Sequence, residues 1–265
     1  MLTKKDFPLI LGMIQPEPCP GSFKNKGMKI DEIINISLKE VEMLQKYGFD
    51  GYIIQNRNDA PIRQKAEVQS IAYMTAISRT LKQAFPKMIQ GILVNWDGVA
   101  SLAVADAAGA DFVRIEHTMT GVEVGYAGFM EAQCVDVCEF RKKIDTDIPV
   151  YADLHEIHYA QIGDKGIDES ARDLIQNAFV DGIFAGGKNL EESLEIGKIV
   201  RKRIGEDAIM MLSSGSTAEN IKDILSVYDG VSVGTWIKNG NLRNPIDEDR
   251  ARRFMQAVNE FKENR

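Results

Sequence analysis

The sequence is poor in cysteine, histidine and tryptophan. Its 265 residues include three cysteines, three histidines and two tryptophans. An odd and sparse set of cysteines is not a disulfide framework, and it favours a reducing, cytoplasmic setting. We expect Cys134 and Cys138, which are four residues apart, to be two buried thiols on one face of a helix.

An excess of positive charge is also missing. The formal net charge is −7 and the isoelectric point is about 5.2. Non-specific nucleic-acid binding and adhesion to an anionic membrane both require a basic face, so this charge disfavours them. It does not exclude an anionic small molecule, because a pocket can be locally positive inside an acidic protein.

Long hydrophobic runs are absent as well. No apolar stretch approaches the roughly 18 residues that a membrane helix needs. The short apolar run near the N-terminus is broken by Pro16 and Pro18 and lacks a small-residue cleavage site, which argues against a signal peptide. We therefore expect no membrane insertion. A homo-oligomer is compatible with the sequence, which does not define the oligomeric state.

Short runs rich in valine and isoleucine recur along the chain, each followed by a segment with helical periodicity. The eight runs are Leu9–Ile14, Tyr52–Gln55, Ile89–Val94, Phe112–Glu116, Val150–Leu154, Gly182–Ala185, Ile209–Ser213 and Val231–Thr235. Strands that alternate with helices predict βαβ units and a parallel sheet. Eight units without a linker, and without a glycine-rich dinucleotide fingerprint, favour one closed (β/α)₈ TIM barrel over residues 1–265.

The intervening segments supply the helices. The expected helices cover residues 30–46, 63–85, 97–108, 131–144, 170–177, 190–204, 218–227 and 248–261. A glycine–aspartate turn precedes four of the strands, with the aspartate at Asp50, Asp111, Asp181 and Asp229. In these turns we expect glycine to relieve steric cost and aspartate to cap the backbone.

Two loops rich in glycine and hydroxyl groups follow the last two predicted strands, where barrels of this kind commonly bind phosphate. The expected phosphate-binding residues are Ser214, Gly215, Ser216, Gly234 and Thr235, with Gly186 and Gly187 after strand six extending the cup. Glycine lets backbone N–H groups approach an anion, and hydroxyls add donors. A short helix beginning near Trp236 would aim its N-terminus at the same anion. The alternative is a pair of ordinary strand-end turns.

Acidic residues and histidines follow the fifth predicted strand. Asp153 and His155 are two residues apart and so share one face of the strand. They could form an acid–base pair, part of a divalent metal site, or a structural hydrogen-bonded pair. His158 lies further out, at the periphery of the same mouth.

Other polar residues follow strands two to four. Arg114 and Glu116 alternate inward with Phe112, and a buried charge needs a partner, so an Arg114–Glu116 pair inside the barrel is expected. Asn56 and Asp59 follow the second strand and are candidates for substrate contact.

Three features carry weaker expectations. Asp97 is best interpreted as the N-cap of the next helix. Lys188 after strand six could form a Schiff base, although a solvated surface lysine is the ordinary interpretation. The loop Gln15–Lys29 could be a lid or a static plug, and residues 118–128 are a second mobile candidate.

A further set of motifs runs from Leu9 to Phe254, nearly the whole chain. They are Leu11-Gly12-Met13-Ile14 with Pro18-Cys19-Pro20-Gly21-Ser22, Asp59-Ala60-Pro61, Phe112-Val113-Arg114, Ala152-Asp153-Leu154-His155, Ser214-Gly215-Ser216-Thr217-Ala218-Glu219-Asn220, and Val233-Gly234-Thr235 with Asn244-Pro245-Ile246-Asp247. Together they resemble the pattern of the BtpA/SgcQ family. The sequence departs from that pattern at Gln15 and Gln55, and at His155 with His158.

The resemblance implies a barrel of the ribulose-phosphate-binding type. One branch of the family is linked to photosystem I biogenesis, and another accompanies sugar-utilisation genes and is loosely called nucleosidase-like. We therefore expect an enzyme acting on a phosphorylated sugar or nucleoside-type small molecule, by C–N or C–C cleavage or isomerisation. The alternative is a non-catalytic assembly factor, with exposed apolar patches and a degenerate pocket.

The expected residue roles follow from these positions. The expected catalytic residues are Asp153, His155 and Glu116, and the expected substrate-binding residues are Asn56, Asp59, Arg114 and His158. No cofactor is indicated other than a divalent metal held by Asp153 and His155.

Overall fold

The computed structural model describes residues 7–154, 157–163 and 165–264. Eight parallel strands close into a barrel in the order β1-β11-β10-β9-β7-β4-β3-β2. These strands are β1 (Leu9–Ile14), β2 (Gly51–Gln55), β3 (Ile89–Leu93), β4 (Phe112–Ile115), β7 (Val150–Asp153), β9 (Gly182–Ala185), β10 (Ile209–Leu212) and β11 (Gly230–Val233). Each of the eight predicted runs overlaps one of them, with β2 and β11 beginning one residue earlier than predicted, so the TIM barrel is confirmed.

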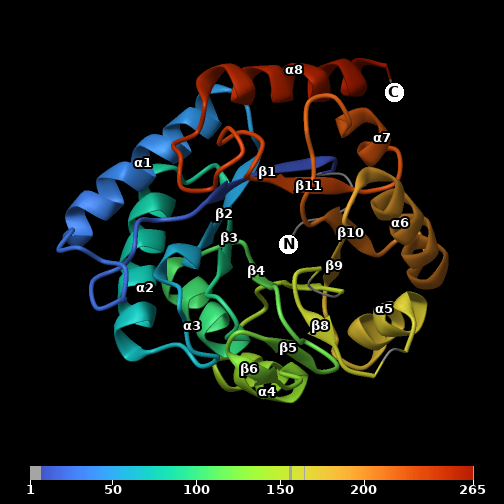
Figure 1. Ribbon diagram of the computed structural model, residues 1–265, viewed down its shortest axis with the longest axis horizontal. Helices are drawn as coiled ribbons and strands as arrows, with labels where there is room; N and C mark the ends of the chain where they lie inside the picture. The colour runs from blue at the N-terminus through green and yellow to red at the C-terminus, as the bar shows by residue number, and fades with distance from the viewer. Residues whose placement is uncertain (1–6, 155–156, 164, 265) are drawn as a thin grey trace.

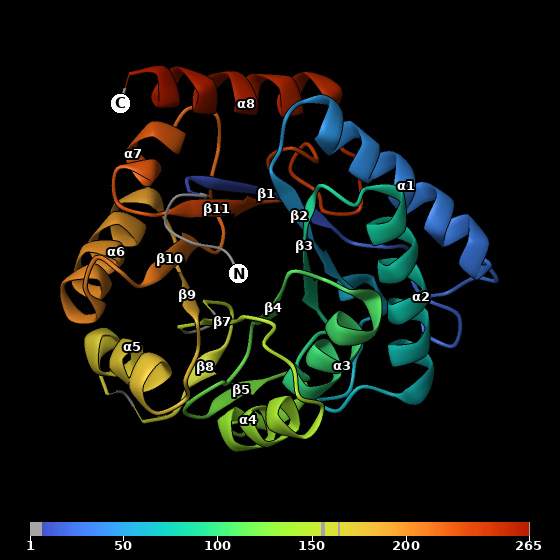
Figure 2. The ribbon, with the colours of Figure 1, turned by 180° about the vertical axis from the view of Figure 1, so that it is seen from behind.

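The helices form a ring around the strands (Figure 1), which Figure 2 shows from the opposite side. They are α1 (Ile30–Lys46), α2 (Val68–Ala84), α3 (Gly98–Ala108), α4 (Cys134–Lys143), α5 (Ile167–Gln176), α6 (Leu190–Ile204), α7 (Ile221–Leu225) and α8 (Glu248–Glu263). In the described ranges we find no helix with both the length and the apolar character needed to cross a bilayer.

Side chains alternate between two cores, as the pleat of a strand requires. Leu9, Leu11 and Met13 of β1 join the cluster inside the barrel, while Ile10 and Ile14 pack in the layer between strands and helices. The interior is filled by pairing large with small side chains. A Cβ on Gly91 would lie 2.3 Å from the ring of Phe112, so glycine makes room for that ring.

The four turn aspartates connect neighbouring strands in pairs. Each carboxylate accepts the N–H of a residue at or near the start of the preceding barrel strand. The bonds run from Ile10 to Asp50 at 2.8 Å, from Gln90 to Asp111 at 2.7 Å, from Val150 to Asp181 at 2.8 Å and from Met210 to Asp229 at 2.8 Å. The predicted capping of the backbone by these aspartates is therefore confirmed. The bonds connect β1 to β2, β3 to β4, β7 to β9 and β10 to β11.

Some details differ from the sequence-based expectations. Helix α2 begins at Val68 rather than at residue 63, because the N–H of Ala66 donates to Asp97 Oδ2 (2.9 Å) and holds the preceding segment against α3. Cys134 and Cys138 lie on α4 but are half-buried rather than buried, and both are free thiols.

The segment 118–128 is not a simple loop. It contains β5 (Glu123–Gly125), which pairs antiparallel with β6 (Gly128–Met130) and with the short strand β8 (Ala160–Gln161). This small sheet lies beside the barrel strands at the lower edge of Figure 1. It adds a wall to the C-terminal face of the barrel, where the candidate site lies.

The pairing of strands by the turn aspartates makes a prediction about stability. Asp229→Ala leaves the Met210 N–H without its acceptor and removes the partner 2.7 Å from Arg201 Nη2. We expect the free energy of unfolding to fall by about 1–3 kcal/mol in urea denaturation. The exposed Asp106→Ala on α3 is the control, with a change within about 0.5 kcal/mol. Equal effects of the two substitutions would contradict this role of Asp229.

Candidate functional site

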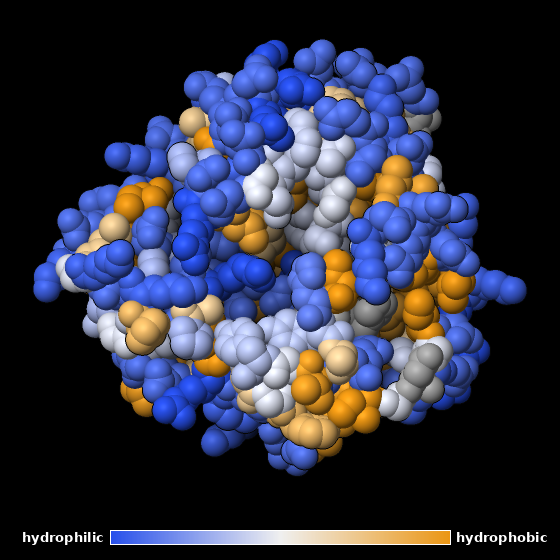
Figure 3. All heavy atoms as spheres, in the orientation of Figure 1, coloured by the Kyte–Doolittle hydropathy of each residue, from blue (hydrophilic) through white to orange (hydrophobic). Residues whose placement is uncertain are grey.

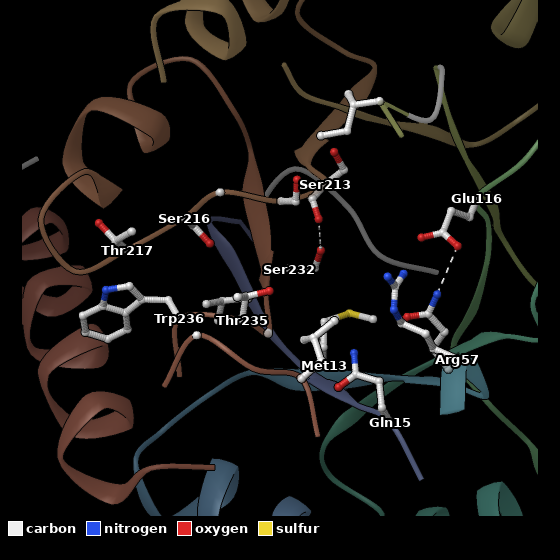
Figure 4. Close-up of a pocket in the computed structure, with 18 of the residues that line it drawn as sticks. Met13, Gln15, Arg57, Glu116, Ser213, Ser216, Thr217, Ser232, Thr235 and Trp236 are labelled. Atoms are coloured by element: carbon white, nitrogen blue, oxygen red, sulfur yellow. Dashed lines mark hydrogen bonds between the residues drawn. The ribbon is translucent and has the colours of Figure 1, made fainter. Parts of the chain in front are cut away.

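A cavity of about 490 Å³ opens at the C-terminal ends of the barrel strands. Figure 3 shows this face hollowed at its centre, with hydrophilic residues at the bottom of the hollow. The loops after β10 and β11 form one side of the cavity, and the ends of β1, β2 and β4 contribute the other (Figure 4). The predicted phosphate residues Ser214, Gly215, Ser216, Gly234 and Thr235 all line it.

The two phosphate loops converge because β10 and β11 are neighbours in the sheet. Ser232 Oγ in β11 donates to the carbonyl of Ser213 at 2.9 Å, which fastens the end of one strand to the other. Gly215 has φ +87°, a left-handed conformation that glycine adopts without steric cost and that lets the loop turn sharply.

Unused hydrogen-bonding groups gather in this cup. Ser216 is 3% exposed, and its Oγ has no hydrogen-bond partner among the described residues. Among the described residues, the backbone N–H groups of Ser214, Gly215, Gly234 and Thr235, which lie nearer the surface of the cavity, have no protein acceptor. Buried polar groups are nearly always paired, so the Ser216 hydroxyl fits a bound anion, and the neighbouring amides can donate to the same anion.

The loop after β10 is braced from below by Asn220. Its Oδ1 accepts from Thr217 N (2.8 Å), and its Nδ2 donates to the carbonyl of Gly215 (2.9 Å). Thr217 Oγ1 in turn accepts from the backbone N–H groups of Glu219 and Asn220. These bonds define the loop geometry without using the amides at its tip.

The expected short helix near Trp236 is absent. Residues 235–240 form hydrogen-bonded turns instead, with the N–H of Lys238 donating to Gly234 (3.1 Å) and that of Gly240 to Thr235 (2.8 Å). The chain cannot continue as a helix because Asn239 and Gly240 both have positive φ. The anion cup therefore relies on loop amides and hydroxyls, not on a helix terminus.

A buried ion pair anchors this turn to α1. The side chain of Lys238 is 1% exposed, and its Nζ lies 2.9 Å and 3.1 Å from the two carboxylate oxygens of Glu40. Burial raises the pKa of Glu40, and the charge of Lys238 acts in the opposite direction. The sequence does not predict that these two residues pair, because they are nearly 200 positions apart.

Cationic and aromatic side chains complete the cup. Arg250, at the start of α8, lines the cavity, donates to the Trp236 carbonyl at 3.2 Å and lies over the Trp236 ring at 5.1 Å from its centroid. Arg57 lines the opposite side. Neither arginine was predicted. The residues next to Arg250 in the sequence do not indicate a site. Arg250 reaches the cavity only because the fold places the start of α8 beside it.

The floor of the cavity contains an ion pair that differs from the predicted one. Arg114 does not pair with Glu116; it pairs with Asp153, at 2.8 Å (Nη2–Oδ2) and 3.2 Å (Nε–Oδ1). Its guanidinium also lies over the Phe184 ring, 4.4 Å from the centroid. The cause is the sheet: β4 pairs with β7, which places Arg114 and Asp153 side by side inside the barrel.

Glu116 lies beyond the end of β4, in the mouth itself. Its Oε2 accepts from Gln55 Nε2 at 3.0 Å (dashed in Figure 4) and lies 3.6 Å from His117 Nε2. His117 Nδ1 contacts Glu123 Oε2 at 3.0 Å, on the far side of the imidazole. Glu116 is therefore a carboxyl group at the cavity surface that is connected to a buried histidine.

Asn56 and Asp59 are placed beside the cavity rather than in its lining. Asn56 Oδ1 accepts from the N–H of Asn95 (2.8 Å), and Asp59 Oδ1 accepts from the N–H of Cys19 (2.7 Å). Burial raises the pKa of Asp59, and the hydrogen bonds to Cys19 and Asn56 lower it. Asn58 bonds the carbonyls of residues 15 and 16, so these residues fasten the loop Gln15–Lys29 to the end of β2.

The remaining predicted residues divide into two groups. His158 lines the cavity, and Asp97 is the N-cap of α3, accepting from Ala100 N–H at 3.0 Å. Gly186 lies against Ser213, and the N–H of Gly187 donates to Ser193 Oγ at 2.9 Å, so neither lines the cup. Lys188 is exposed and lies outside the cavity.

A divalent metal held by Asp153 and His155 receives no support from the described residues. His155 lies outside the described ranges. Both oxygens of Asp153 accept from the Arg114 cation. Within those ranges no group of three His, Cys, Asp or Glu side chains is arranged to hold a metal ion.

Comparison with known sequences gives a match to the model of the BtpA family over residues 6–260. The chain belongs to the BtpA family. An uncharacterized relative from Methanocaldococcus jannaschii is 29% identical, covering 99% of this chain and 98% of its own. The photosystem I biogenesis protein BtpA of Synechocystis is 26% identical, covering 95% of this chain and 88% of its own.

Solved structures resemble this BtpA-family barrel in fold. A thiamine phosphate pyrophosphorylase from Pyrococcus furiosus superposes with a TM-score of 0.59 at 14% identity, covering 97% of this chain and 98% of its own. A phosphoribosylanthranilate isomerase from Thermotoga maritima superposes with a TM-score of 0.57 at 13% identity. The superposition covers 95% of this chain and 98% of the isomerase chain. These similarities show that the chain has the (β/α)₈ barrel fold.

The buried pair in this BtpA-family protein makes a second prediction. Lys238→Met would leave Glu40 buried without its cation, and we expect the free energy of unfolding to fall by about 3–5 kcal/mol. The double variant Glu40→Leu with Lys238→Met removes both charges and should lose much less. Urea denaturation measures both. A double variant that is no more stable than Lys238→Met would contradict this role of the pair.

Proposed function

We propose that this protein is an enzyme that acts on a phosphorylated sugar or nucleoside-type small molecule, with the phosphate held between the loops after β10 and β11. The observation that carries the proposal is the buried Ser216 hydroxyl, which has no hydrogen-bond partner in the described ranges and lies in a loop whose tip amides also have no acceptor there. Arg250 adds positive charge to the same cavity. The names of two structurally similar barrels, a thiamine phosphate pyrophosphorylase and a phosphoribosylanthranilate isomerase, each contain a phosphorylated small molecule.

Glu116 is our candidate for proton transfer. Asp153 accepts two hydrogen bonds from Arg114, one at each of its carboxylate oxygens. Glu116 has one hydrogen bond from Gln55, borders the cavity and adjoins His117. C–N cleavage, C–C cleavage and isomerisation all need a group that gives or accepts a proton near the sugar, and this carboxyl group is placed for that role.

The phosphate assignment is tested by ligand-dependent stabilisation. A phosphorylated ligand at a hundredfold excess over its Kd should stabilise the protein by about 2.7 kcal/mol, which a thermal-shift assay detects. The probes are ribose 5-phosphate, glucose 6-phosphate and inorganic phosphate, each compared with unphosphorylated ribose.

Ser216→Asp with Thr235→Asp should abolish this shift, because the new carboxylates repel the phosphate. Thr80→Asp with Ser226→Asp adds the same charge outside the cavity and should leave the shift unchanged. Survival of the shift in the first double variant would refute the phosphate site.

The role of Glu116 is tested by turnover. Purified protein is incubated with a panel of phosphorylated sugars and nucleotides, and consumption is followed by phosphorus NMR. Glu116→Gln should lower the rate of consumption by about 10²–10⁴-fold, the usual contribution of a positioned acid or base, while the phosphate-dependent thermal shift persists. Full activity in the variant would exclude Glu116 as the proton-transfer group.

The alternative is a non-catalytic assembly factor. It is suggested by the name of the Synechocystis relative, a photosystem I biogenesis protein. Such a protein has no need of unpartnered donors in a cavity. It would show no stabilisation by any phosphorylated probe and no consumption of any compound in the panel, so the same two assays distinguish the hypotheses.

A further inference from the structure

A second cavity, of about 720 Å³, adjoins the phosphate cup. The two cavities share lining residues, including Arg57, Glu116, His158 and Thr235. They are therefore two ends of one continuous cleft, and Glu116 lies at the boundary between them. The proposed function uses the phosphate end and leaves this second end without a role.

The far end of the cleft is walled by aromatic side chains, a group we call the aromatic recess: Trp96, His117, Tyr126 and Tyr159. The Trp96 ring lies 4.8 Å from that of Tyr126 and 6.2 Å from that of Tyr159, and the His117 and Tyr159 rings are 4.7 Å apart. Tyr126 is 60% exposed although it belongs to this cluster. An exposed aromatic face beside a cavity is a surface on which a flat ligand ring can stack.

The backbone at the recess is strained and firmly held. Trp96 has φ +66° and Thr118 has φ +41°, a region that costs a bulky or branched residue free energy. On either side of Trp96, the N–H of Asn95 is bonded to Asn56, and the side chain of Asp97 accepts from the N–H groups of Ala66 and Ala100. The surroundings thus maintain a conformation that Trp96 would not adopt alone, as at many ligand sites.

The recess also contains an unused polar atom. Asn95 is 6% exposed and lines the second cavity, and its Oδ1 has no hydrogen-bond partner among the described residues. A buried carboxamide oxygen without a partner is costly unless a ligand supplies a donor. Asn95 would give a stacked ring its edge contact, since ring N–H and exocyclic amino groups are donors.

We infer that the cleft binds a compound with two ends: a phosphate in the cup and a planar aromatic or heteroaromatic ring in the aromatic recess. The inference rests on the proposed phosphate site and narrows its ligand class to ring-bearing sugar phosphates. The bond between the ring and the sugar would then lie near Glu116, at the boundary of the two cavities.

The chain has two tryptophans, one at each end of the cleft: Trp96 in the recess and Trp236 in the cup. The probes are ribose 5-phosphate, which has no ring, and two nucleoside 5′-monophosphates, one purine and one pyrimidine. Trp236→Phe leaves Trp96 as the only reporter, and its fluorescence should change with a nucleotide but not with ribose 5-phosphate. Trp96→Phe leaves Trp236, whose fluorescence should respond to both kinds of probe.

Affinity provides the second measurement. Calorimetry should show at least one nucleotide binding about tenfold or more tightly than ribose 5-phosphate, in line with one stacked ring. Tyr126→Ala should remove this advantage and leave the Kd of ribose 5-phosphate unchanged. Phe129→Ala, 63% exposed on the adjacent strand and outside the cavity lining, is the matched control and should alter neither Kd.

The outcomes separate the two proposals. Equal affinity for ribose 5-phosphate and both nucleotides, or an advantage that survives Tyr126→Ala, overturns the aromatic recess as a ring site and leaves the phosphate site intact. Failure of all three probes to bind overturns both. A nucleotide advantage that is lost in Tyr126→Ala and kept in Phe129→Ala supports the inference.

Discussion

The parallel pairing of β11 with both β10 and β1 is the constraint on which the site depends. It closes the barrel, and it brings the loops after β10 and β11 to one place although the residues proposed to bind the anion lie about 20 positions apart in sequence. The bond from Ser232 Oγ to the carbonyl of Ser213 couples the two strand ends directly. Amides that belong to different βα units can therefore face a single anion.

Charge in the interior follows a consistent pattern. Arg114 with Asp153, and Lys238 with Glu40, are ion pairs in which both partners are largely buried. Each pair is internally neutral and stiffens the base of the cleft or the turn beside it, since a buried charge is costly unless it is compensated. The side chains left to meet a ligand are at the surface of the cleft: Glu116, Arg57 and Arg250. The charges of the buried pairs thus stabilise the fold, whereas the charged side chains at the surface of the cleft can contact a bound molecule.

The sequence predicted the barrel well because its signals are local. The alternation of apolar runs with helical stripes identified all eight barrel strands, and the turn aspartates marked every second strand. The convergence of the loops that carry Ser216 and Thr235 was also predictable, since these residues follow strands whose order in a barrel is known. Errors arose where a partner lies far along the chain: Arg114 was assigned to Glu116, two residues away, and not to Asp153 on the neighbouring strand.

The sequence by itself determined the class of fold and the position of the two loops proposed to bind phosphate, because strand and turn preferences depend on residues close together in the chain. Tertiary structure alone decided which charges neutralise one another, and that Arg250 from α8 enters the cup. It also decided that Trp96, Tyr126 and Tyr159 share one wall. Those contacts join residues from separate βα units, and only closure of the barrel brings their side chains within reach.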